Sequence, residues 1–181
     1  MSKINTFILQ GKESFSNSKL EQLNLDFNNS NNKSSTISSK EIYIVAAKSD
    51  DLNLDQLKNI LAADHPDDSF SFIVGPRSGT ISPWSSKTED IIKNVGILNI
   101  NRVEKFNSFT ISDFSIDNNL DLSMFYDRMT QSIYSDHEEC LAFLKTDPQR
   151  AVNIIDILSS GIEALENANK SFGFALSADE I

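Results

Sequence analysis

The chain of 181 residues is 39% apolar and 23% charged, a composition that suits one compact domain with an appendage and excludes a disordered chain. Its 26 acidic residues outnumber the 16 basic ones, for a formal net charge of −10, and the basic residues are scattered. Nucleic acids and anionic membranes require clustered Lys and Arg, so we expect neither as a partner. The longest apolar runs also fall far short of the roughly 20 residues that cross a bilayer.

The N-terminus and the cysteine content indicate the compartment. The stretch from Met1 to Asn5 contains neither a long apolar segment nor a small-residue cleavage site. Cys140 is the single cysteine, so it cannot form an internal disulfide. We therefore expect a cytoplasmic protein.

The first 40 residues predict a strand, a helix and a loop. A β-branched and apolar run predicts a strand within Ile4–Leu9. Ser18 followed by Glu21 is a capping box, so we expect a helix to begin at Ser18. The stretch from Asn28 to Lys40 is too polar to bury a face and predicts a surface loop. The buried side of the helix is expected to hold Leu20, Leu23 and Phe27.

Strands and helices alternate through the middle of the chain. Apolar runs predict strands at Glu41–Ala47 and Ser69–Val74, and one or two further strands over Ile97–Lys105 and Phe109–Asp113. Helical spacing predicts a helix at Asn53–Ala63.

Helices are expected to dominate the C-terminal part. Within Asp121–Tyr134, helical spacing places Leu122, Phe125, Met129 and Ile133 on one stripe. Pro148 breaks the chain, so we place a domain boundary there, with residues 1–147 before it and residues 148–181 after it. A final capping box at Ser177–Glu180 predicts the start of a helix, but the sequence ends at Ile181 after one turn. A single turn is not a stable helix. We therefore expect the chain to be truncated.

The segment from Gly75 to Gly96 predicts a strand exit, a rigid loop and a helix. Two prolines, Pro76 and Pro83, fix their own φ, while Gly75 and Gly79 can adopt positive φ.

The helix that follows this loop also has recognisable ends. Ser86 and Glu89 form a capping box, so we expect the helix to begin at Ser86. Gly96 is suited to end it.

The segment from Gly75 to Gly96 resembles a signature of large-type phosphoribosylformylglycinamidine synthases, also called formylglycinamide ribonucleotide amidotransferases. That signature reads Pro-Arg-x-Gly-Thr-Ile-Ser-Pro-Trp-Ser-Ser-Lys-Ala-Thr-Asp-Ile. The matching stretch here is Pro76–Ile91. Further similarity lies at Arg102–Lys105 and at Asp127–Thr130, and Gly161–Ile181 resembles the start of the family's linker domain.

The resemblance implies a ligase of purine biosynthesis that uses ATP, Mg²⁺ and ammonia from glutamine. It implies an α+β fold with a mainly antiparallel sheet covered by helices, similar to a dimer of the separate small subunit of multi-subunit versions. The beginning of a helical linker follows that domain. The family's Ser-Glu-His-Cys-Arg-His motif and its glutaminase nucleophile are absent here, so the resemblance assigns this chain no catalytic, cofactor-binding or metal-binding residue.

The implied role is therefore that of a scaffold whose partners are the synthetase and glutaminase domains of the same parent chain. The alternative is a free-standing interaction module that binds a glutaminase in trans. A third class is a hydrolase that uses Ser85 or Ser86 with Lys87, but adjacent side chains at a helix start diverge and a capping role is favoured. We select Arg77, Trp84 and Lys87 as candidate interdomain contacts, with a core position for Trp84 equally compatible with the sequence.

Three other patterns favour structural roles. Gly75–Gly79 matches neither of the Gly-rich phosphate-binding patterns. His137 and Cys140 share a helical face but lack a second pair of zinc ligands. Paired carboxylates could bind a divalent ion, but those of this chain stand where helix starts and turns favour Asp in any case. They are Asp50, Asp51, Asp55, Asp67 and Asp68.

Overall fold

The computed structural model describes residues 4–48, 52–66, 69–114, 120–144 and 152–181. The chain divides into two compact units, Met1–Thr146 and Asp147–Ile181. Four of the paired carboxylates considered above, Asp50, Asp51, Asp67 and Asp68, lie outside the described residues.

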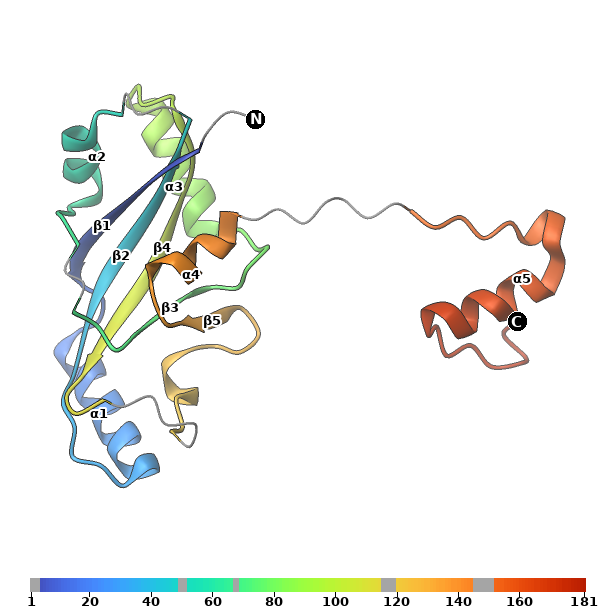
Figure 1. Cartoon of the computed structure of the whole chain (residues 1–181), viewed down its shortest axis with the longest axis horizontal. Helices are drawn as coiled ribbons and strands as arrows, with labels where there is room; N and C mark the ends of the chain where they lie inside the picture. The colour runs from blue at the N-terminus through green and yellow to red at the C-terminus, as the bar shows by residue number, and fades with distance from the viewer. Residues whose placement is uncertain (1–3, 49–51, 67–68, 115–119, 145–151) are drawn as a thin grey trace. The chain divides into compact units, whose positions relative to one another are not determined.

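The first unit is built on a five-stranded sheet in which every pairing is antiparallel (Figure 1). The order of the strands is β1-β2-β4-β3-β5, so β1 and β5 are the edges. The predicted α+β class with a mainly antiparallel sheet is confirmed. The strands are β1 Asn5–Glu13, β2 Ile37–Ala47, β3 Phe72–Pro76, β4 Ile100–Ile111 and β5 Gln131–Tyr134.

The predicted loop at Asn28–Lys40 is wrong at both of its ends. Helix α1 (Asn17–Asn31) extends into it, and β2 begins at Ile37. The chain turns between them because Asn32 adopts a left-handed φ of 51° and the Asn28 amide exchanges two 2.9 Å hydrogen bonds with the backbone of Ser35. Pairing with β4 keeps the polar residues that follow Ile37 in the sheet.

The region predicted to hold one or two strands forms a single strand. β4 runs without interruption through Asn107 and Ser108, which lie between the two predicted ranges. It is paired on both sides, with β2 and β3, and the Ser108 hydroxyl donates to the Lys40 carbonyl at 3.2 Å. Backbone pairing on two sides therefore outweighs the low strand propensity of Asn and Ser.

Helix α1 begins earlier than predicted, whereas α2 begins close to its predicted start. Ser16, not Ser18, caps α1, because its side chain accepts from the Lys19 amide at 3.4 Å. Asn53 caps α2 (Leu54–Leu61) at the predicted place by accepting from the Gln56 amide.

The predicted helix at Asp121–Tyr134 is wrong. A short 3-10 helix, η1 (Ser123–Phe125), is followed by a turn and then by β5. Asp127 makes this turn: its carboxylate accepts from the Met129 amide at 2.8 Å and from the Thr130 hydroxyl at 2.9 Å. Such side-chain bonds to the local backbone compete with helix formation, and pairing with β3 fixes the outcome.

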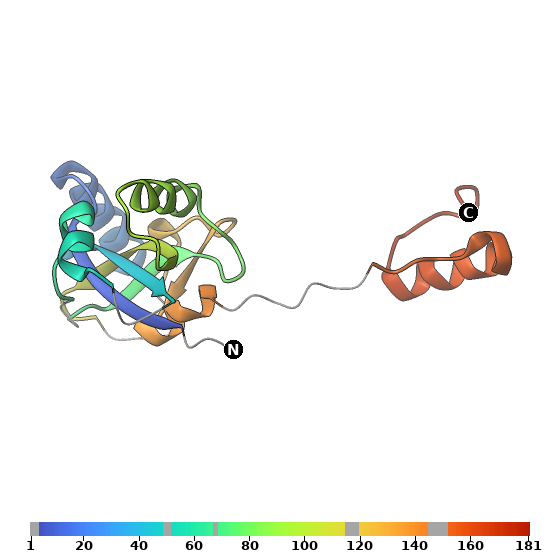
Figure 2. The same cartoon turned by 90° about the horizontal axis from the view of Figure 1, so that it is seen from above.

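The two faces of the sheet carry separate cores. On one face α1, α2 and α3 (Pro83–Asn94) pack against alternate residues of the long strands, whereas α4 (His137–Cys140) and η2 (Leu141–Leu144) cover the other face (Figure 2). The side chains of β2 alternate accordingly, with Tyr43 and Val45 towards α2 and α3 and with Ile42 and Ile44 towards α4.

The second unit is a helix followed by a returning segment. Helix α5 (Ile157–Phe172) contains a break at Gly161, which has a φ of 68°, and ends at Gly173 in the left-handed conformation. The Asn169 amide then exchanges two hydrogen bonds, at 3.0 and 2.9 Å, with the backbone of Leu176. At Ser177 the predicted capping pattern is present in one direction, since its amide donates to the Glu180 carboxylate at 2.8 Å.

The expectation of positive φ is confirmed for Gly79, at 80°, but not for Gly75, which lies within β3. Gly75 is needed for a different reason. A Cβ on it would stand 1.9 Å from Cδ1 of the buried Phe106 ring. The absence of a side chain is therefore what allows Phe106 to lie flat across the neighbouring strand.

We expect Gly75→Ala to lower the free energy of unfolding by roughly 1–3 kcal/mol, because the new methyl group overpacks a closed site. Chemical denaturation measures the change. The control, Asn101→Ala, changes an exposed position of β4 and should stay within about 0.5 kcal/mol of wild type. Equal stabilities of the two variants would contradict the proposed close approach.

Candidate functional site

The loop between β3 and α3 contains the residues on which the sequence comparison rested. Ser82 ends the loop and caps α3, because its hydroxyl accepts from the Ser85 amide at 3.0 Å. The predicted cap, Ser86, lies inside the helix instead. Pro83 explains the earlier start, since its fixed φ and missing N–H suit the first helical position. Gly96 follows the helix end with a φ of 91°.

A tight turn shapes the first half of this loop. The Thr80 amide and hydroxyl both donate to the Arg77 carbonyl, at 3.1 and 2.7 Å. Gly79 supplies the left-handed φ within the turn. The Arg77 amide donates to the Thr130 carbonyl at 3.1 Å, which continues the pairing of β3 with β5. The loop therefore begins as an extension of the sheet.

A fully buried carboxylate holds the second half of the loop. Glu104 of β4 accepts from the Ser82 hydroxyl and from Arg102 Nη2, the latter at 2.9 Å. The same Arg102 nitrogen donates to the Thr80 carbonyl at 2.5 Å. One ion pair in the sheet therefore binds two points of the loop, and the loop is pre-organised.

A groove of about 400 Å³ lies between this loop and the turn before β5. Its two most exposed apolar side chains are Ile81, at 64%, and Met129, at 80%. The groove therefore brings together two stretches, Pro76–Ile91 and Asp127–Thr130, that the sequence comparison had matched separately. Its lining consists of Pro76, Thr80, Ile81, Ser82, Pro83, Met129, Thr130 and Gln131.

Trp84 is half-buried and packs towards the sheet. Its ring stacks on Tyr43 at 5.5 Å between centroids, and Lys105 Nζ lies 5.8 Å from its ring centroid. Lys105 also pairs with Glu41 at 3.3 Å, and Glu41 accepts a hydrogen bond from the Tyr43 hydroxyl. Burial, together with this bond and the Glu41 charge, raises the pKa of Tyr43. Trp84 therefore has a packing role in the core.

The other two candidate contacts are at the surface. Arg77 is exposed, and its guanidinium reaches the Met129 carbonyl at 3.4 Å, beside the groove. Lys87 is exposed on α3, and among the residues described it forms no ion pair. No described contact joins Arg77, Trp84 and Lys87, so their role as interdomain contacts stays a prediction.

The hydroxyl groups near Lys87 are engaged elsewhere. The Ser85 side chain is buried and donates to the Val103 carbonyl at 2.5 Å and to Glu89 at 3.2 Å. Ser86 and Lys87 are both exposed. Among the described residues, Lys87 therefore has no contact through which it could activate a serine hydroxyl.

Cys140 and His137 occupy α4 without a metal-binding arrangement. Burial, together with the nearby Asp136 and Glu139 charges, raises the pKa of the Cys140 thiol to about 12. The His137 ring lies 4.9 Å from Phe70. Within the described ranges, no three His, Cys, Asp or Glu side chains gather as metal ligands.

Asp55 stands in the first turn of α2, where its charge suits the helix dipole.

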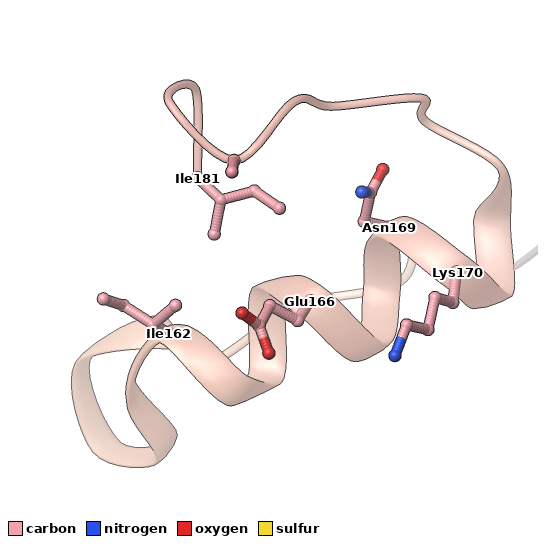
Figure 3. A pocket seen from close by; sticks show the side chains of 6 residues that line it. Ile162, Glu166, Asn169, Lys170 and Ile181 are labelled. Atoms are coloured by element: carbon pink, nitrogen blue, oxygen red, sulfur yellow. The ribbon is translucent and has the colours of Figure 1, made fainter.

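A second hollow, of about 380 Å³, lies within the second unit between α5 and the returning segment (Figure 3). Ile162 and Ile181 mark one end, and Glu166 and Lys170 lie one turn apart on the helix. Neither a nucleophile and base pair nor a cluster of like charges lines it. We therefore assign it no chemistry.

The fold and the groove define the class of this chain: an α+β domain with one antiparallel sheet and a rigid surface loop at its edge. Residues 40–143 match the family model described as formylglycinamide ribonucleotide amidotransferase N-terminal, and the chain belongs to that family. The family associates the chain with the purine-biosynthesis amidotransferase. The resemblance seen in the sequence is thereby confirmed.

Sequence reasoning missed Ile81 and Met129 as groove residues and Glu104 as the anchor of the loop. A signal for Glu104 was present, because Arg102 and Glu104 stand two residues apart in an apolar strand and so must share one face. Met129 was assigned to the apolar stripe of a helix that does not form.

Among the described residues, no helix is long and apolar enough to span a membrane.

We expect Ser82→Ala to lower the free energy of unfolding by about 2–4 kcal/mol, because it removes the helix cap and leaves a buried carboxylate without one donor. Ser86→Ala is the matched control and should change stability by less than about 0.5 kcal/mol. Urea denaturation distinguishes them. A larger effect at Ser86 would restore the cap position predicted from the sequence.

We expect the Cys140 thiol to react with a disulfide reagent at pH 8 at least about a hundredfold more slowly in the native protein than in denaturant, because burial suppresses the thiolate. Its pKa is higher in the folded than in the unfolded chain, so ionisation opposes folding only as the pH rises above the ordinary value of 9.0. Equal rates in the two states would contradict the burial of Cys140.

Proposed function

We propose that this chain is a scaffold region of phosphoribosylformylglycinamidine synthase and is itself non-catalytic. The parent ligase converts formylglycinamide ribonucleotide, glutamine and ATP to formylglycinamidine ribonucleotide, glutamate, ADP and phosphate. The family match over residues 40–143 is the observation that carries the proposal. The rigid loop at residues 76–83 supports it, because a docking surface benefits from being formed before its partner binds.

The chemistry of the loop favours a structural role. The Ser82 and Ser85 hydroxyls donate to protein acceptors, and the Glu104 carboxylate is buried in an ion pair with Arg102. General acid–base or nucleophilic catalysis requires such groups to reach a substrate. These three groups instead stabilise the fold.

The proposed partners are the glutaminase and synthetase domains of the same parent chain, and ATP and Mg²⁺ would bind in those domains. Arg77 and Lys87 are the exposed candidates for contact with them. The proposed compartment is the cytoplasm, which suits a protein with a single, buried cysteine because structural disulfides are rare there.

Activity measurements on four proteins test this function: the full parent, the chain of residues 1–181, the parent lacking residues 1–146, and an equimolar mixture of the last two. We expect glutamine-dependent product formation by the full parent and none by residues 1–181. Deletion should reduce the glutamine-dependent rate at least tenfold and the ammonia-dependent rate less, because docking couples the two active sites.

Turnover by residues 1–181 alone would overturn the non-catalytic assignment. Full activity of the deleted parent would overturn the scaffold role. Recovery of activity on mixing would favour the alternative in which this region acts in trans on a glutaminase.

A further inference from the structure

The groove beside Met129 has the features of a binding site for an extended polypeptide segment. Ile81 and Met129 are large apolar side chains that remain 64% and 80% exposed on a loop and a turn. Removal of such apolar surface from water favours association. Arg102 donates to the Thr80 carbonyl, and Glu104 accepts from the Ser82 hydroxyl. Because these hydrogen bonds fix the loop, a partner would not have to order it.

An edge strand borders this groove. β5 is the last strand of the sheet, and Gln131 belongs both to β5 and to the groove lining. The Arg77 amide donates to the Thr130 carbonyl, so Gln131 and Ile133 direct their backbone groups away from β3, and the Gln131 amide donates to the Asp127 carbonyl at 2.7 Å. Within the described residues, the Gln131 carbonyl and the backbone groups of Ile133 remain as a short template for one more strand.

The exposed charges of the groove indicate the chemistry of that strand. Arg77 reaches the Met129 carbonyl, and Arg128 is exposed beside Met129 in the chain. The one exposed carboxylate in the turn, Asp127, accepts hydrogen bonds from the turn itself, which hold its pKa below the ordinary value. The two exposed guanidinium groups of Arg77 and Arg128 outnumber the single ionised carboxylate of Asp127, so this part of the surface has a positive excess on a chain of net charge −10.

We propose that this groove and the edge of β5 bind an extended segment from another domain of the parent synthase, with an apolar side chain between Ile81 and Met129 and an acidic side chain at Arg77. The segment adds a sixth strand to the sheet. This inference rests on the proposed scaffold function and specifies the surface that performs it.

Site-specific photo-crosslinking in the full parent protein tests the inference. The probe is p-benzoylphenylalanine in place of Met129, and the matched control carries the same probe in place of Leu25, which is 59% exposed on α1 and does not line the groove. We expect crosslinks from position 129 to map to one segment outside residues 1–146 with Asp or Glu within a few residues of the attachment point. Position 25 should not label that segment.

A second pair of variants tests the charge. Arg77→Glu should lower the crosslinking yield from position 129 at least about fivefold, whereas Arg77→Lys should retain most of it, because charge complementarity sets partner choice. Arg77 is exposed, and retained thermal unfolding temperatures confirm that both variants fold.

Crosslinks that scatter over several surfaces or join two copies of the chain would overturn the inference. A crosslinking yield from position 129 that Arg77→Glu leaves unchanged would also overturn it. These failures are distinguishable from failure of the scaffold function. If deletion of residues 1–146 abolishes coupling but the crosslinks scatter, the groove is wrong and the scaffold role stands. If the isolated chain turns over substrate, the scaffold role is wrong whatever the crosslinks show.

Discussion

A carboxylate that is removed from water needs hydrogen-bond donors or a counter-ion. The partners of Glu104, Arg102 and Ser82, determine the path of the surface loop at residues 76–83. The charge of Glu104 is 0% exposed in the middle strand of the sheet, where an unpaired carboxylate would be strongly unfavourable. Arg102 compensates the charge, and Ser82 donates from the loop. The sheet thereby fixes the start of α3 and the path of residues 76–83. Arg102 and Glu104 therefore hold the loop against β4 through Thr80 and Ser82.

The close approach of β3 to Phe106 complements this polar attachment. Gly75 leaves room for the ring, and the Tyr134 hydroxyl donates to the Pro76 carbonyl at 2.5 Å just before the loop begins. An apolar contact and a backbone hydrogen bond therefore fix the entrance of the loop, while Glu104 fixes its exit. A surface loop held at both ends can present Ile81 and Arg77 in a constant geometry. This property links the packing of the sheet to the docking role that we propose.

Local patterns predicted the elements whose signals were strong and failed where a longer-range interaction decided. The apolar runs that lie in β2 and β3 and the amphipathic α2 were found, because burial on a sheet leaves a clear pattern. The sequence left open whether the region of β4 holds one strand or two, and pairing on two sides makes it one. The helix expected at Asp121–Tyr134 failed because the side chain of Asp127 formed a turn and β3 offered a partner for the residues after it.

For the site, the sequence alone determined the family and indicated a rigid loop, because a contiguous motif with two prolines carries that information locally. It left open whether Arg77 and Lys87 form salt bridges or lie in water. Only the tertiary structure decided that Trp84 packs against Tyr43 and that Met129 meets Ile81 across a groove. Those contacts join segments far apart in the chain. They depend on the order of the strands in the sheet, which no local spacing encodes.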